Sequence, residues 1–210
     1  MTPPSTLQTA LQEGLHALGL ALTPAVQEKL IAYIELLAKW NQAYNLTAVR
    51  DPEQMIARHL LDSLTILPLV RGPRVLDLGS GAGLPGIPLA LARPDSSFVL
   101  LDSNAKKTRF LVQAVAELGL KNVEVVQERA EKYHPAAKFD TLIARAFAGI
   151  ADMLSVSAPL RAPGGRWLAM KGVYPQEEMA TIPPGYTIET QKLQVPGLDA
   201  ARHVVIITAR

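Results

Sequence analysis

Cysteine is absent from this chain of 210 residues. Its absence excludes disulfide bonds, metal sites built from thiolates and a cysteine nucleophile, and it is compatible with the cytoplasm. Apolar runs long enough to span a membrane are also missing, and residues 1–5 lack the basic and apolar segments of a secretory signal. We therefore expect a cytoplasmic protein without a membrane partner, and we expect no metal site.

A large excess of either charge is missing as well, because 21 basic residues face 19 acidic ones and the formal net charge is +2. A charge this small excludes a global field that attracts nucleic acid, so binding to nucleic acid would need a local basic patch. Hydrophobic residues make up 49% of the chain, which is enough for a substantial core. The length fits one domain with an appendage.

The glycine-rich segment 74–86 is the most informative part of the sequence. An apolar, strand-like run leads into Asp77, and Gly79, Gly81 and Gly83 follow at alternate positions. Glycine is needed where the backbone turns through a left-handed conformation or where a ligand approaches closely. A strand, a glycine turn and a helix start together form the cradle of nucleotide-type cofactors. A turn that binds nothing could carry the same glycines, so a second signal is needed.

Two cofactor patterns fit this loop. Residues 81–86 match the G-x-G-x-x-G of dinucleotide-binding domains, whereas residues 79–83 match the G-x-G-x-G of S-adenosylmethionine (AdoMet) enzymes. Asp77 favours AdoMet, because a carboxylate would repel a pyrophosphate but would attract a cationic amino group. Pro85 and Pro88 favour AdoMet too, since they remove N–H donors that a pyrophosphate would use.

The second signal is Asp102, which ends the apolar segment 97–102. It follows the glycine loop by roughly twenty residues, where a βαβ unit places an acid that accepts hydrogen bonds from ribose hydroxyls. Asp102 could instead cap the next helix, a role that Ser103 or Asn104 could also fill. Together with the glycine loop, we interpret Asp102 as a ribose ligand.

Strands and helices alternate from Arg74 onward, which predicts a parallel sheet covered on both faces. The expected strands are 74–79, 97–102, 123–127, 139–145 and 165–171, and the expected helices are 85–93, 105–118 and 149–160. Two further strand-like segments, 186–195 and 203–208, follow without a helix between them. They predict an antiparallel pair at the sheet edge, an ending typical of AdoMet methyltransferases.

The first seventy residues predict helices instead. Leucines at 7, 11, 15 and 18 share one helical face that ends near Gly19, while Thr23 and Asp51 are each followed by proline and mark two further helix starts. The segment 40–47, which we expect to connect two helices, is both polar and aromatic.

Several longer motifs accompany the loop and carry more specific information. They are Lys39-Trp40-Asn41, Tyr44-Asn45-Leu46-Thr47, Arg58-His59-Leu60-Leu61-Asp62-Ser63, Asp77 through Pro88, Leu100-Leu101-Asp102-Ser103, Ala144-Arg145-Ala146-Phe147-Ala148, Lys171-Gly172, Gln194-Val195-Pro196 and Arg202-His203. In these motifs the chain resembles the bacterial small-subunit ribosomal RNA guanine-N7 methyltransferases called RsmG or GidB. The resemblance runs through nearly the whole chain.

The resemblance implies a class I AdoMet-dependent methyltransferase, which is a Rossmann-like α/β fold with a mostly parallel seven-stranded sheet. It implies an N-terminal helical extension at residues 1–72 and an AdoMet-binding core at residues 73–210. The implied reaction moves a methyl group from AdoMet to N7 of one guanine in 16S ribosomal RNA and leaves S-adenosyl-L-homocysteine. Including the loop residues argued above, the expected cofactor residues are Asp77, Gly79, Gly81, Leu84, Asp102, Ser103, Asn104, Ala130, Glu131 and Arg145.

Guanine N7 has a lone pair and no proton, so attack on the methyl group needs no general base and we assign no catalytic residue. The residues that we expect to meet RNA are Tyr44, Asn45, Arg58, His59, Phe147, Lys171 and Arg202. His59 fits a structural role equally well, Trp40 fits the core better than a stacking platform, and Glu131 and Arg145 could be ordinary surface residues. We expect a monomer that acts on ribosomal RNA or on the small ribosomal subunit, and not on DNA.

Three other functions fit parts of the sequence. Asp77, the prolines and the terminal strand pair oppose an NAD-dependent oxidoreductase. An RNA-binding assembly factor without catalysis is opposed by the intact glycine loop, Asp77 and Asp102. A methyltransferase of small molecules or proteins fits the residues as well as the main hypothesis does, because a class I fold does not determine its substrate.

Overall fold

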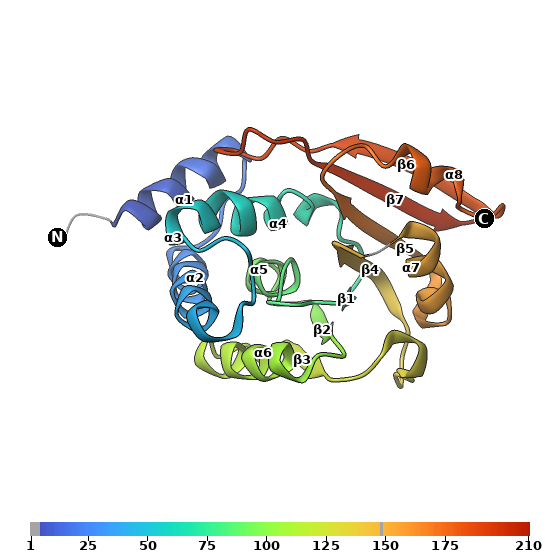
Figure 1. The fold of residues 1–210 in the computed structure, drawn as a ribbon, viewed down its shortest axis with the longest axis horizontal. Helices are drawn as coiled ribbons and strands as arrows, with labels where there is room; N and C mark the ends of the chain where they lie inside the picture. Colours follow the sequence, from blue (N-terminus) through green and yellow to red (C-terminus); the bar gives the residue numbers. More distant parts are fainter. Residues whose placement is uncertain (1–4, 148) are drawn as a thin grey trace.

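The computed structural model describes residues 5–147 and 149–210, and it shows one sheet with helices on both sides (Figure 1). Two sequence interpretations reach past these residues: the missing signal at residues 1–5 and the motif 144–148, whose parts at 1–4 and at Ala148 lie outside the described residues. Within the described ranges, no helix is both long and apolar enough to cross a lipid bilayer.

The first two N-terminal helices begin at capping residues, and the start at Thr23 agrees with the sequence expectation. Helix α1 (Thr6–Ala17) starts at a capping box formed by Ser5, and α2 (Pro24–Tyr44) starts at Thr23, whose hydroxyl accepts a hydrogen bond from the N–H of Val26. These bonds satisfy N–H groups that the first helical turn leaves without partners.

The expected connector at 40–47 is wrong in its first half, because α2 continues through Tyr44. Trp40 and Tyr44 stack on the same helical face with their ring centroids 5.1 Å apart, a favourable pair at a spacing of four residues. Asn45 ends the helix in the left-handed conformation with φ of 50°. Trp40 is half-buried and packs on Phe110 with centroids 5.7 Å apart, which confirms its core role.

A third helical segment runs without a break through residues 52–64 and contains a π-helix. It consists of α3 (Pro52–Met55), the π-helix η1 (Ile56–Leu61) and α4 (Asp62–Leu64), and the short turn η2 (Leu67–Leu69) then leads into the sheet. Rare π-helical turns are often found at functional sites, and η1 carries Arg58 and His59.

The sheet has the predicted topology. Its strands are β1 (Arg74–Leu78), β2 (Ser97–Leu101), β3 (Val123–Val126), β4 (Phe139–Arg145), β5 (Arg161–Lys171), β6 (Tyr186–Lys192) and β7 (His203–Ala209), in the spatial order β3-β2-β1-β4-β5-β7-β6. The first five are mutually parallel, whereas β7 lies antiparallel between β5 and β6. The expected terminal pair of antiparallel strands is therefore confirmed.

Helices cover the two faces unequally. Helices α5 (Gly86–Ala92) and α6 (Ala105–Glu117) lie on the same side as α1 and α2, and α7 (Ile150–Ser157) lies on the other side (Figure 1). Buried residues of α1, α2 and η1 share one hydrophobic cluster with those of α5 and α6. The N-terminal helices are thus part of the core that supports the loop after β1.

Three boundaries differ from the sequence expectations. The helix expected at 149–160 ends at Ser157 and gives way to the 3₁₀ turn η4 (Ala158–Leu160), because Pro159 cannot donate the next helical hydrogen bond. β5 begins at Arg161 rather than at 165, and β6 ends at Lys192 rather than at 195. Two short elements were not expected: η3 (Ala130–Lys132) and α8 (Gln176–Ala180).

Candidate active site

The glycines of the loop after β1 adopt conformations that other residues rarely adopt. Gly79, Gly81 and Gly83 have φ values of 65°, 61° and 86°. A side chain on Gly86 would collide with Leu100 and would bring its Cβ within 2.6 Å of Asp77 Oδ2. A Cβ on Gly79 would meet no atom within 4 Å, so the loop is open on that side.

Asp77 fixes the conformation of this loop through two hydrogen bonds. Its side chain is fully buried, and Oδ2 accepts hydrogen bonds from the Ser80 hydroxyl at 2.6 Å and from the Gly86 N–H at 3.0 Å. Burial raises the pKa of Asp77 to about 6, although Ser80, Gly86 and the Arg145 charge act in the opposite direction. Oδ1 is buried without a hydrogen-bond partner in the described part of the chain. A buried oxygen of this kind needs an explanation, and a cationic ligand group would supply one.

Tyr33 supports the loop from α2, and sequence reasoning missed it. Its hydroxyl donates a 2.7 Å hydrogen bond to the carbonyl of Ala82, and the side chain is fully buried. No motif singled Tyr33 out, because in sequence it is one more apolar position of an amphipathic helix.

Asp102 organises the end of β2 from the opposite side of the loop. Its two oxygens accept hydrogen bonds from the N–H groups of Gly81 at 2.9 Å and Asn104 at 2.8 Å. The cap of α6 is Asn104, whose side chain accepts from the N–H groups of Lys106 and Lys107. Asp102 is therefore not the helix cap, and each of its oxygens keeps a lone pair for a ligand.

A cavity of about 170 Å³ lies at this edge of the sheet. It is lined by Gly79, Leu101, Asp102, Ser103, Glu128, Arg129, Ala130, Glu131, Phe147 and Val156. Five of the expected cofactor residues meet here, namely Gly79, Asp102, Ser103, Ala130 and Glu131. Its volume is below the roughly 300–1,000 Å³ of ligand pockets, so the cavity accommodates part of a nucleoside cofactor rather than all of it.

The other expected cofactor residues do not belong to the lining of this cavity. Leu84 is buried in the hydrophobic core, Asn104 caps α6, and Gly81 binds Asp102. Phe147, which we expected to meet RNA, lines the cavity together with the cofactor residues. Glu128, Arg129 and Val156 were missed, because no motif marks them.

A second cavity, of about 350 Å³, lies across the end of β4. It is lined by Asp62, Arg145, Ala146, Met170, Lys171, Gly172, Leu193, Arg202 and His203. Ala146 has an unusual positive φ of 58°, a conformation that costs a non-glycine residue free energy and is typical of functional sites. Because Ala146 lines this cavity and Phe147 lines the first, the turn after β4 forms the wall between the two.

Arg145 crosses from β4 to the N-terminal helices. Its Nη1 lies 3.4 Å from Asp62 Oδ2 and 3.4 Å from the Arg58 carbonyl oxygen in the π-helix. Asp62 also accepts a hydrogen bond from Arg202 Nε at 3.1 Å. Burial raises the pKa of Asp62, and the two arginine charges oppose that rise.

The residues that we expected to contact RNA are of two kinds in the structure. Some are exposed to solvent, and others are bound to groups of the protein itself. The side chains of Tyr44, Asn45 and Arg58 are exposed, whereas Lys171 Nζ is bound to Glu178 at 2.7 Å and to the Phe147 carbonyl at 3.2 Å. His59 is buried, and its Nε2 lies 2.9 Å from Thr47 Oγ1. Burial and the Arg145 charge lower its pKa to about 4. The burial of His59 and its contact with Thr47 favour the structural interpretation over an RNA contact.

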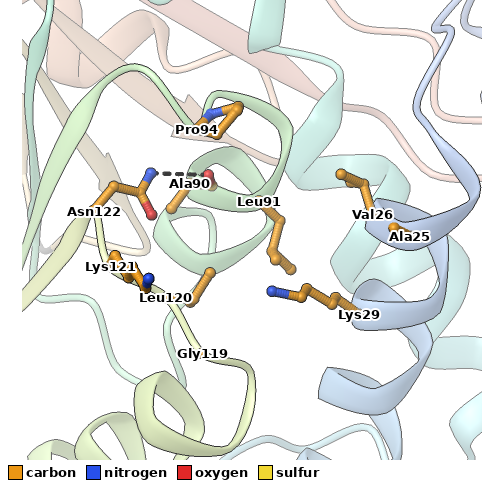
Figure 2. Close-up of a pocket in the computed structure, with 10 residues that line it drawn as sticks. All are labelled: Ala25, Val26, Lys29, Ala90, Leu91, Pro94, Gly119, Leu120, Lys121 and Asn122. Atoms are coloured by element: carbon orange, nitrogen blue, oxygen red, sulfur yellow. Dashed lines mark hydrogen bonds between the residues drawn. The ribbon is translucent and has the colours of Figure 1, made fainter.

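A further cavity, of about 440 Å³, lies at the opposite edge of the sheet, between α2, α5 and the loop before β3 (Figure 2). Lys29 extends into it toward Leu91 and Leu120, and no carboxylate or histidine belongs to its lining. The amide of Asn122 is already bound to three carbonyl groups. This cavity thus offers no arrangement of groups for chemistry.

Comparison of the amino-acid sequence with known proteins shows to which family the chain is similar. The sequence profile of the GidB family, described as rRNA small subunit methyltransferase G, matches residues 26–205. The chain is 53% identical to "Ribosomal RNA small subunit methyltransferase G" of Laribacter hongkongensis, over 97% of this chain and 99% of that protein. It is 53% identical to the protein of the same name from Neisseria meningitidis serogroup A, over 95% and 97% of the two chains.

Solved structures confirm the fold. An AdoMet-dependent methyltransferase from Aquifex aeolicus superposes with a TM-score of 0.60 at 19% identity and covers 81% of this chain and 97% of its own. A methyltransferase from Thiobacillus denitrificans, in complex with S-adenosyl-L-homocysteine, gives 0.55 at 17% identity over 84% and 97% of the chains. The chain has the class I AdoMet-dependent methyltransferase fold, and by sequence it belongs to the GidB family of ribosomal RNA small subunit methyltransferases G.

Proposed function

We propose that the protein transfers a methyl group from AdoMet to N7 of a guanine in the RNA of the small ribosomal subunit. The observation that carries this proposal is the pair of cavities on either side of the turn after β4. One contains the acid and glycine pattern of a nucleoside site, and the other is rich in cationic side chains. Membership of the family supports ribosomal RNA as the substrate over a small molecule or a protein.

The residues around the first cavity fit AdoMet. The unpartnered Oδ1 of Asp77 suits the ammonium of the methionine part. Arg145, which we also expected among the cofactor residues, lines the second cavity instead, and its charge lowers the pKa of Asp77. Asp102 has free lone pairs for ribose hydroxyls, and Ser103, Ala130 and Glu131 lie further along the same cavity. When it is bound, AdoMet supplies an electrophilic methyl group on a sulfonium.

The second cavity fits a nucleotide. Its volume of about 350 Å³ lies in the range of ligand pockets. Arg145, Lys171 and Arg202 bring three positive charges against the carboxylates of Asp62 and Glu178, so one net positive charge remains and an anionic ligand is favoured. Because guanine N7 has no proton to lose, these residues need only to orient the base, and orientation can supply roughly 7–11 kcal/mol of a reaction barrier.

We further propose a division of labour between the two parts of the chain. Residues 73–210 bind AdoMet, and the helices within residues 1–72 position the RNA through the exposed side chains of Tyr44, Asn45 and Arg58. Arg202 contacts RNA from the core. The protein acts as a cytoplasmic monomer.

Transfer of tritiated methyl groups from AdoMet tests the proposal. Naked ribosomal RNA, small ribosomal subunits and bulk protein are offered separately, and the label is mapped. We expect label in one guanine of the small-subunit RNA, as N7-methylguanine. Label in protein or at another atom of the base would contradict the proposal, and the relative rates on naked RNA and on the particle identify the physiological substrate.

A further inference from the structure

One carboxylate, Asp62, lies between two arginines that come from distant parts of the chain. Arg145 ends β4 and Arg202 precedes β7, while Asp62 belongs to the helical segment before the core. Asp62 Oδ2 lies 3.4 Å from Arg145 Nη1, and Asp62 Oδ1 lies 3.1 Å from Arg202 Nε. The two guanidinium groups would repel each other without a negative charge between them. Asp62 therefore determines the positions of both guanidinium groups.

The three side chains differ in exposure in a way that separates their roles. The side chain of Asp62 is 3% exposed, whereas each arginine side chain is 25% exposed. A guanidinium group has five N–H donors. Arg145 uses Nη1, and Arg202 uses Nε together with Nη1, which binds the Ala201 carbonyl. Among the described residues neither Nη2 group has a partner, so donors remain for a ligand in the cavity that both arginines line.

Resting on the proposed function, we infer that Asp62 is a positioning residue for methyl transfer. It holds Arg145 and Arg202 as a clamp for the nucleotide in the second cavity and does not contact the nucleotide itself. The clamp binds phosphate oxygens next to the guanine, because arginine recognises phosphate through paired N–H groups and N7 must remain free for the methyl group.

Positioning and simple attraction make opposite predictions for the loss of this charge. Removing a carboxylate makes the cavity more positive, so Coulomb attraction alone would favour RNA binding. If Asp62 instead orients the arginines, its removal leaves the RNA bound but wrongly placed. Orientation errors reduce the rate of the chemical step more than they reduce affinity.

The variant Asp62→Asn of the full chain tests this inference, and Asp95→Asn serves as the control. Asp95 is exposed in the loop between α5 and β2, at the far edge of the sheet, so the control makes the same charge change away from the site. We measure single-turnover methylation at saturating small subunits and the dissociation constant for the same particle. We expect Asp62→Asn to lower the rate at least tenfold while RNA affinity stays within threefold or improves, and Asp95→Asn to change neither by more than twofold.

A rate within twofold of the wild type would overturn the inference, and so would a rate loss that merely follows weakened RNA or AdoMet binding. If thermal melting shows that Asp62→Asn does not fold, Arg202→Lys decides. Lysine keeps the positive charge but lacks the planar guanidinium group with its paired N–H donors. We therefore expect the rate of methylation to fall at least tenfold while RNA affinity stays within threefold. An unchanged rate overturns the inference. If the wild-type protein methylates no RNA, the proposed function is refuted. If the wild type is active and Asp62→Asn methylates RNA at the same rate, only this inference is refuted.

Discussion

Replacing Asp77 by asparagine should increase the stability of the protein and weaken its binding of AdoMet. Asp77 Oδ2 accepts hydrogen bonds from Ser80 and Gly86, and the amide oxygen of asparagine can accept both. The substitution therefore keeps the shape of the loop. It removes the buried negative charge and puts an amide nitrogen where the unpartnered Oδ1 stands.

The expected gain in stability follows from the pKa of Asp77. Burial raises this pKa from 3.8 to about 6. Each pKa unit corresponds to about 1.4 kcal/mol, so the buried charge costs up to about 3 kcal/mol. Because the folded pKa lies above the unfolded one, the wild type loses this stability as the pH rises from about 4 to about 6. The variant has no such loss, so its advantage should be absent near pH 4 and complete above pH 6.

Denaturant unfolding at pH 4.5, 6 and 8 measures the stability difference, and isothermal titration with AdoMet at pH 8 measures the function. We expect a more stable variant at pH 8 that binds AdoMet at least tenfold more weakly, because amide N–H groups repel the ammonium that a carboxylate attracts. Asp95→Asn is again the matched control for charge. A variant that is less stable at pH 8 would refute the reasoning about burial, and unchanged AdoMet affinity would remove Asp77 from the cofactor site.

Three further predictions follow from individual side chains. Asp102→Ala should weaken AdoMet binding by about 1–3 kcal/mol and lower the melting temperature, since the N–H groups of Gly81 and Asn104 lose their acceptor; unchanged AdoMet affinity in a folded variant would contradict the ribose role. Burial lowers the pKa of His59 to about 4. Because the folded pKa lies below the unfolded one, the wild type has its full stability above pH 6.5 and loses part of it as the pH falls to 4. Relative to His59→Gln, the wild type should thus gain up to about 3 kcal/mol between pH 4 and 7, and a constant difference in unfolding free energy would show that the burial argument is wrong. Tyr44→Ala combined with Asn45→Gly, where glycine keeps the left-handed end of α2, should leave AdoMet affinity within about twofold and lower RNA methylation at least tenfold; equal methylation would make these residues purely structural.

Single-turnover methylation should also change little between about pH 6.5 and 8.5, because attack by N7 requires no side chain to gain or lose a proton. The measurement uses saturating AdoMet, so that ionisation of Asp77 does not enter the rate. A steep limb in this range would reveal an acid or base that the proposed reaction lacks.

Local sequence patterns were enough to predict the sheet, the order of its elements and the edge at which we place the cofactor. Buried parallel strands appear as apolar runs, and the glycines after β1 mark backbone conformations that only glycine adopts easily. Caps such as Thr23 and Asn104 act on N–H groups two or three residues away, so neighbouring residues suffice to predict them. Asp102 was predictable for the same reason, because a βαβ unit sets its distance from the glycine loop.

Which side chains contact one another depends on how the helices and strands pack. Asp62 and Arg202 are 140 residues apart in sequence and bind each other, and no local pattern encodes such a contact. His59 lies in a motif that suggested RNA but is buried, and Lys171 is engaged by Glu178 from the unexpected helix α8. Burial and the partners of a charge depend on elements that pack from elsewhere in the chain. For that reason the types of residue in the site could be predicted from the sequence. Which of them face the cofactor, which face RNA and which support the structure depends on how the helices pack against the sheet.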